Sequence, residues 1–100
     1  MKNMGQMMKQ MKQMKDKMDQ VQKELETKEV VGTAEGGVVK VTMNGHKVMC
    51  KVEIDPEIVD DIGMLQDLIV AANSDAMQKA DKMIEQDMGP LTAGLNIPGL

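Results

Sequence analysis

The feature that most constrains this chain is a set of apolar residues that recurs every three or four positions between residues 4 and 25. This spacing fills the a and d positions of successive heptads and predicts one long amphipathic helix. Met, Lys, Gln and Glu, which favour helix, dominate the segment, and no proline interrupts it. A helix about 30–35 Å long on so short a chain must cover its apolar side with a partner. We call these residues the heptad stripe: Met4, Met7, Met11, Met14, Met18, Val21 and Leu25.

The lysines are concentrated in the same segment, although the protein as a whole is acidic. Residues 1–28 carry seven lysines against four acids, a net charge of +3. Residues 29–100 carry five lysines against twelve acids, a net charge of −7. Such an asymmetry favours an anionic partner, such as nucleic acid, for the N-terminal helix. A face of lysine and glutamine that only keeps the helix in solution fits the composition equally well.

Composition excludes several classes of protein. The chain has no Phe, Tyr, Trp or Arg, and it has thirteen Met. Base stacking by aromatic side chains is therefore impossible, and bidentate reading of guanine is limited. The single Cys50 fits a reducing cytosol, and the sequence shows neither the pattern of a signal peptide nor an apolar run of about 20 residues. We predict one small cytoplasmic domain without membrane contact.

The middle of the chain predicts a three-stranded antiparallel meander. β-Branched residues and glycines mark strands at Glu29–Ala34, Gly37–Met43 and His46–Ile54. Between the last two lies Asn44-Gly45, which is typical of a two-residue type I′ hairpin turn.

This turn sets the predicted register and thereby decides which side chains are covered. It places Met43 opposite His46 and Val39 opposite Cys50. One face then carries apolar side chains and the other carries three lysines, as expected of a sheet covered on one side. The lysines of the predicted outer face are Lys40, Lys47 and Lys51. The predicted covered face consists of Val39, Val41, Met43, Val48, Cys50, Val52 and Ile54, joined by Val30, Gly32 and Ala34.

A second long helix is predicted after the sheet. Asp55-Pro56-Glu57 favours a single helical turn, with Asp as the cap and Pro at the first helical position. The long helix follows over Met64–Met88, and the tail Gly89–Leu100, with two prolines, is predicted to be irregular. The result is an α+β fold of order α-β-β-β-α, with one domain over residues 1–88 and a tail over 89–100. The buried stripe of the second helix should be Leu65, Leu68, Ile69, Ala72, Ala76, Ala80, Met83 and Ile84.

Both predicted helices are longer than the sheet that they cover. Strands of about 6–9 residues span about 20–30 Å, while a helix of 24 residues spans about 36 Å. The overhanging apolar stripes would face water in a monomer, and exposed apolar surface of that extent marks an interaction surface. We therefore predict a homodimer. The heptad stripe either pairs with its own copy or packs on the 64–88 helix, and its spacing is compatible with both.

An ordered set of motifs along the whole chain resembles the YbaB/EbfC family of small bacterial nucleoid-associated proteins. The set begins with the Met/Lys/Gln-rich opening and the glycine-rich hairpin before Val38–Met43. No single motif is specific, but their order is. The others are Asn44-Gly45, Val52-Glu53-Ile54-Asp55-Pro56, Met64-Leu65-Gln66-Asp67-Leu68, Ala71-Ala72-Asn73 and Gly94-Leu95-Asn96-Ile97-Pro98-Gly99.

The resemblance implies a tweezer-shaped homodimer with a β core and helical arms, which binds double-stranded DNA of the nucleoid with low sequence specificity. In such a dimer the heptad stripe would pack on the last helix. The implied DNA contacts lie on both arm helices, but the second arm departs from the family pattern, because acids at 75, 81, 85 and 87 surround its two lysines. The implied DNA-binding residues are Lys9, Lys12, Lys15 and Lys17 on the first helix, and Lys79 and Lys82 on the last.

No pattern in the sequence indicates an enzyme, a cofactor, a metal site or a small-molecule substrate. A metal site usually needs three or four ligands, and His46 is the only histidine. Cys50 is predicted to be a small buried apolar side chain. The acids between 55 and 61 are explained by helix capping. The alternative to DNA binding is a dimeric scaffold whose Met-rich helices receive partner proteins, because Met-rich surfaces adapt to many partners.

Overall fold

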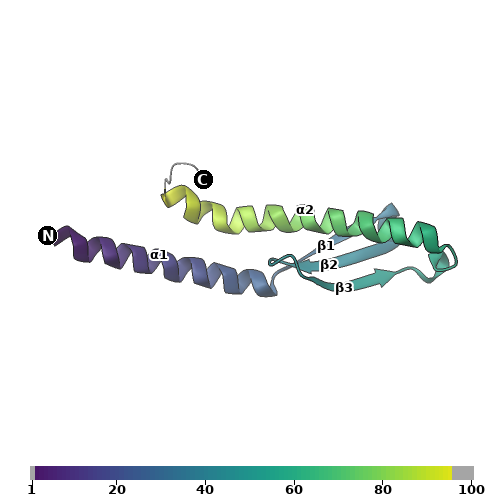
Figure 1. Cartoon of the computed structure of the whole chain (residues 1–100), viewed down its shortest axis with the longest axis horizontal. Coiled ribbons are helices and arrows are strands. Elements are labelled where there is room, and N and C mark those ends of the chain that lie inside the picture. Colours follow the sequence, from purple (N-terminus) through teal and green to yellow (C-terminus); the bar gives the residue numbers. More distant parts are fainter. Residues whose placement is uncertain (1, 96–100) are drawn as a thin grey trace.

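A computed structural model describes residues 2–95 of the chain and confirms the predicted order of helices and strands (Figure 1). The three strands form one antiparallel sheet in the order β1-β2-β3. Short 3₁₀ turns at Glu35–Gly37 and Pro56–Ile58 lie on either side of the β2–β3 hairpin in the chain. The long elements are α1 (Lys2–Thr27), β1 (Glu29–Ala34), β2 (Val39–Asn44), β3 (Met49–Ile54) and α2 (Ile62–Leu95).

The molecule is elongated because both helices run past the sheet at the same end (Figure 1). Its principal extents are 71 × 24 × 16 Å. α2 packs on one face of β1 and β2, whereas α1 approaches α2 and β2 only near its own C-terminal end. We call the parts of α1 and α2 that extend beyond the sheet the arms.

The core lies between α2 and the covered face of β1 and β2. Val39 and Val41 are fully buried, and the core that they form with α2 contains three fully buried alanines of that helix. Small residues are needed here because the two backbones lie close together, and a Cβ at Gly32 would overlap the backbone of α2. The predicted buried stripe of α2 is confirmed in part. Four of its residues are buried and the other four are half-buried: Leu68, Ala72, Ala76 and Ala80 are buried, and Leu65, Ile69, Met83 and Ile84 are half-buried.

The predicted register between β2 and β3 is wrong. Val39 pairs with Ile54 rather than with Cys50, and β3 begins at Met49 rather than at His46. The cause is the longer turn. Asn44 Oδ1 accepts hydrogen bonds from the backbone N–H of His46 at 2.8 Å and of Val48 at 3.1 Å.

This loop of residues 45–48 changes where several side chains lie. Lys47 takes a left-handed φ of 61° and lies in the loop, not on the outer face of the sheet. Val48 is exposed, and so is Cys50, against the prediction that both are buried. Val52 and Ile54 do share the face of Val41 and Val39, but they are 38% and 37% exposed because α2 does not extend over β3.

The α2 helix begins earlier and ends later in the chain than predicted. The helix begins at Ile62, where Asp61 Oδ1 accepts a hydrogen bond from Met64 N at 3.0 Å. It continues through Pro90 to Leu95, so the predicted irregular tail is wrong for residues 89–95, and residues 96–100 lie outside the described part. Half-buried Leu91 faces α1 across the hollow between the arms. The predicted turn after β3 is confirmed, with Asp55 Oδ1 accepting from Glu57 N at 3.0 Å.

Candidate nucleic-acid interface

The N-terminal half of α1 is a basic rod without acids. Residues 1–15 contain four lysines and no Asp or Glu. At 100° per residue, lysines at a spacing of three are 60° apart, so three of them follow one flank of the helix, from the side opposite the heptad stripe at Lys9 to the border of the stripe at Lys15. All three are exposed, and none forms an ion pair with another residue of the described range 2–95. We call them the arm lysines: Lys9, Lys12 and Lys15.

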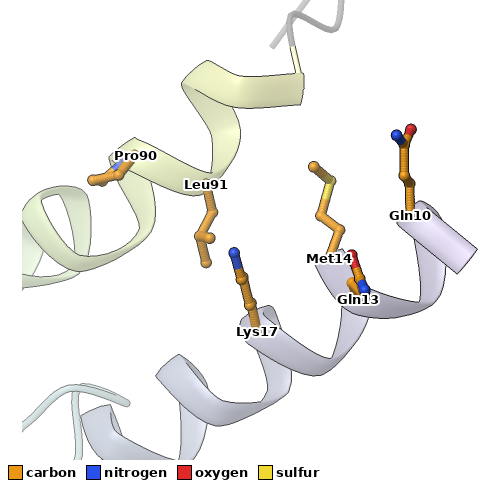
Figure 2. Close-up of a pocket in the computed structure, with 6 residues that line it drawn as sticks. All are labelled: Gln10, Gln13, Met14, Lys17, Pro90 and Leu91. Atoms are coloured by element: carbon orange, nitrogen blue, oxygen red, sulfur yellow. The ribbon is translucent and has the colours of Figure 1, made fainter.

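Lys17 lies apart from the arm lysines. It is on the opposite flank of the stripe and lines a hollow of about 350 Å³ between the two arms. Figure 2 shows Lys17 and Leu91 pointing toward each other from α1 and α2, with Met14 on the same side of α1. Lys17 can therefore reach a ligand that enters between the arms, but not the same surface as Lys9 or Lys12.

The heptad stripe is covered only toward the base of α1. Leu25 is 3% exposed, and Met14, Met18 and Val21 are half-buried. The outer residues Met4, Met7 and Met11 are 59–69% exposed. A single chain therefore leaves the outer half of the stripe bare.

Lys79 is held at the edge of the sheet. Its Nζ donates to the Val31 carbonyl at 2.9 Å and lies 3.0 Å from Asp75 Oδ2. The same Asp75 oxygen accepts a hydrogen bond from the Thr33 backbone N–H at 2.9 Å. The bond from Thr33, supported by Lys79, lowers the pKa of Asp75. A phosphate contact by Lys79 would have to replace these interactions.

Two lysines outside α2 form ion pairs with acids of α2 and neutralise part of their negative charge. Lys28 Nζ is 2.7 Å from Asp87 Oδ2, and this hydrogen bond raises the pKa of Lys28. Lys47 pairs with Asp81. Lys82 is exposed and forms no ion pair with the residues that the structure describes, but it is close enough to Asp75 to contribute to its lowered pKa. The second arm therefore presents little net positive charge, in contrast to α1.

The remaining candidate residues show no arrangement for catalysis. His46 lies in the β2–β3 loop, and Cys50 Sγ donates weakly to the Val48 carbonyl at 3.4 Å. Among residues 2–95, no three His, Cys, Asp or Glu side chains are grouped as a metal would require. Within the same range, neither helix is long and apolar enough to cross a membrane.

Comparison with known proteins gives a match over residues 1–95 to the YbaB/EbfC DNA-binding family. The chain belongs to this family. Membership confirms the resemblance seen in the sequence, and a DNA-binding family agrees with the expectation that the protein is not an enzyme.

Two relatives are similar over almost the whole chain. A nucleoid-associated protein of Bacillus cytotoxicus is 56% identical over 101 residues, covering 99% of this chain and 93% of the relative. A nucleoid-associated protein of Geobacillus sp. is 58% identical over 102 residues, covering 100% and 94%. The crystal structure of an uncharacterized protein from Helicobacter pylori shares the fold, with a TM-score of 0.64 at 20% identity over 76% of this chain and 90% of that one.

Two features of this YbaB/EbfC chain escaped the sequence analysis. Lys79 and Asp75 bond to residues of β1 that lie 48 and 42 positions away from them in the sequence, and no local pattern reveals such contacts. The hydrogen bond between His46 and the Gln22 carbonyl of α1 likewise joins distant segments. By contrast, the excess of lysine on the first helix was identifiable from the sequence, and the family resemblance pointed to the arm lysines within it.

Proposed function

We propose that this protein is a nucleoid-associated protein that binds double-stranded DNA as a homodimer in the cytoplasm, mainly through contacts to the phosphate backbone. The uncompensated charge of the arm lysines on the first arm of a YbaB/EbfC protein is the observation that carries the proposal. The names of the relatives support the association with the nucleoid.

Low sequence specificity follows from the side chains available. Lys donates to phosphate as a point charge, and the chain has no Arg for bidentate contacts to guanine and no aromatic side chain. Backbone contacts of this kind release counterions, so affinity falls steeply with salt. Of the lysines implied by the resemblance, we retain Lys9, Lys12 and Lys15 as primary contacts. Lys17 and Lys82 are secondary, and Lys79 serves the edge of the sheet.

The DNA contact is tested by two variants of equal charge change. K9Q/K12Q removes two arm lysines, and K40Q/K51Q removes two exposed lysines of the sheet. In a polarisation titration of a short duplex, the arm variant should bind more weakly, and its log–log salt slope should fall by about 0.9 for each phosphate that the protein no longer neutralises. The sheet variant should keep the wild-type slope. Equal slopes for the arm variant and wild type would contradict the proposal.

The homodimer is supported by a difference between the two edges of the sheet. Two of the outward backbone groups of β1 are occupied, since Thr33 N–H donates to Asp75 and the Val31 carbonyl accepts from Lys79. Side chains that cap an edge in this way block pairing with another strand. No hydrogen bond of this kind protects β3 among the described residues.

The free groups of β3 follow from its pairing with β2. Asp55 N donates to the Val38 carbonyl at 2.8 Å, and bonded pairs alternate along an antiparallel ladder. Since Asp55 is bonded to β2, Ile54 is not bonded, and neither is Val52, two residues earlier in β3. The N–H and C=O of Val52 therefore point away from β2. Val52 and Ile54 also leave part of their side chains uncovered. A second copy of β3, antiparallel across a two-fold axis, satisfies these backbone groups and covers these side chains.

A proline substitution at this edge tests the dimer. V52P removes an outward N–H without touching a bond to β2, while V52T keeps the N–H and the shape of the side chain. We expect V52P to elute as a monomer in size-exclusion chromatography with light scattering, at a concentration where V52T is dimeric. V52K, which places like charges across the axis, should also dissociate the dimer. Dimers of unchanged strength in both V52P and V52K would exclude β3 as the interface.

The exposed outer half of the heptad stripe supports a second candidate function, a scaffold that receives partner helices. Met4, Met7 and Met11 are adaptable apolar side chains held on a regular helix. The duplex titration separates the two functions, because a scaffold predicts no binding of duplex by the wild-type protein even at low salt.

A further inference from the structure

The β2–β3 loop is seated against the base of the first arm. Gly45 N donates to the Leu25 carbonyl at 2.8 Å and lies 3.2 Å from the Lys28 carbonyl. A Cβ at position 45 would lie 2.6 Å from both the Cβ and the carbonyl oxygen of Leu25, so only glycine fits without a shift. This contact ties the loop to the end of α1 and buries Leu25.

His46 adds a second contact one turn earlier in α1. Its Nε2 is 2.9 Å from the Gln22 carbonyl oxygen. A carbonyl only accepts, so Nε2 carries the hydrogen and donates it. The loop is held in place for this contact, since Asn44 Oδ1 accepts from the His46 backbone N–H at 2.8 Å. His46 itself is exposed, and the hollow beside it is lined by Asp19, Lys23 and Glu26.

We propose that His46 is a positioning residue that fixes the direction of the first arm relative to the sheet. The inference rests on the proposed DNA contact of the arm lysines, because the direction of α1 decides where those lysines meet the duplex. Gly45 and His46 together hold α1 at Leu25 and at Gln22, one turn apart, and two points on one helix restrict its tilt where one point would not.

A small change in the tilt of α1 at its base moves the arm lysines by a large distance, because they lie far along the helix. Lys9 is 13 residues from Gln22, or about 20 Å along a helix. A tilt of about 10° at the base therefore moves Lys9 by about 3.5 Å, close to the roughly 3.4 Å of helix axis per phosphate on one DNA strand. Within the described residues 2–95 the outer arm has little other support, since Met4, Met7 and Met11 are exposed. Removal of the His46 contact should therefore spread the lysines over many positions.

The experiment measures the direction of the arm and the binding of DNA separately. In a C50S background, spin labels at Q6C and Q78C, both at exposed positions, report by pulsed electron resonance the distance between the first arm and the part of α2 that packs on the sheet. Labelled protein is diluted into unlabelled protein. H46A removes the donor, whereas H46Q retains an amide N–H that reaches the same carbonyl. Duplex affinity of each variant is measured by polarisation, and far-UV circular dichroism monitors folding.

We expect H46A to broaden the distance distribution and to weaken duplex binding about 3- to 10-fold, while its thermal midpoint stays unchanged. H46Q should restore the wild-type distance distribution and the wild-type affinity. An unchanged distribution in H46A would overturn the inference, as would equal broadening in H46A and H46Q. Weaker binding without broadening would also overturn it, because His46 would then act by touching DNA. If the wild type bound no duplex, the proposed function would fail, while the distance distributions would still decide whether His46 positions the arm.

Discussion

Because α2 lies so close to β1, a single methyl group added at Gly32 should lower the stability of the fold strongly. A Cβ at Gly32 would lie 2.6 Å from the Cα of Ala76, and closer still to the backbone N of Ala76 and O of Ala72. Ordinary contact begins at 3.4 Å, and the obstructing atoms are backbone that cannot rotate aside. G32A therefore forces α2 away from the sheet by about 1 Å, which forfeits a quarter to a half of the dispersion attraction across the affected contacts.

The expected cost is about 3 kcal/mol, at the upper end of the range for overpacked cores. With a urea m-value of about 1.5 kcal/mol/M, the unfolding midpoint of G32A should fall by about 2 M. Far-UV circular dichroism is the suitable probe because the chain has no Trp or Tyr. All variants are compared at one protomer concentration, since association stabilises the folded state.

G5A is the matched control for this measurement. Nothing lies within 4 Å of a Cβ at Gly5, which is in α1, so alanine there should leave stability unchanged or raise it by up to about 1 kcal/mol. A midpoint of G32A equal to that of wild type would show that α2 does not pack this closely on β1, and the reasoning about the core would fail.

Two further predictions concern polar contacts at the ends and edges of elements. The folded-state pKa of Asp75 is lowered, so its contribution to stability is present above the ordinary carboxyl pKa of 3.8 and is lost as pH falls through the lower folded value. The stability difference between wild type and D75N, measured by urea unfolding, should therefore shrink as the pH is lowered from about 6 to below about 3.8. A difference independent of pH would contradict the hydrogen bonds from Thr33 and Lys79 that lower the pKa of Asp75. D61A removes the acceptor for Met64 N and should lower the unfolding free energy by about 1 kcal/mol, whereas D60A, next to it and without a capping bond among residues 2–95, should have little effect in the same assay.

Local patterns were sufficient where one residue or one period decides the structure. The three-and-four spacing over residues 4–25 predicted a helix, and α1 contains the whole of that segment, because a helix depends on contacts between residues a turn apart. The cap at Asp55 was predictable for the same reason. The arm lysines belong to this class too, since their exposure follows from the period of the helix that carries them.

The register of β3 shows where local patterns fail. Asn44-Gly45 favours a two-residue turn by itself, but the chain forms the longer loop that lets Gly45 and His46 bind the end of α1. The same shift in pairing puts Cys50 on the surface and places Lys47 beside Asp81.

Local sequence patterns were enough to predict the helices and strands, their order and the excess of lysine on the first helix, because these depend on neighbours within a turn or a strand. The tertiary structure decided the length of the β2–β3 loop, the passage of α2 through Pro90 and the role of Lys79. The loop and Lys79 are bonded to distant segments of the chain, whose approach a local pattern does not encode. The distinction holds for the proposed interface: charge on the arm comes from the sequence, and the direction of the arm comes from the fold.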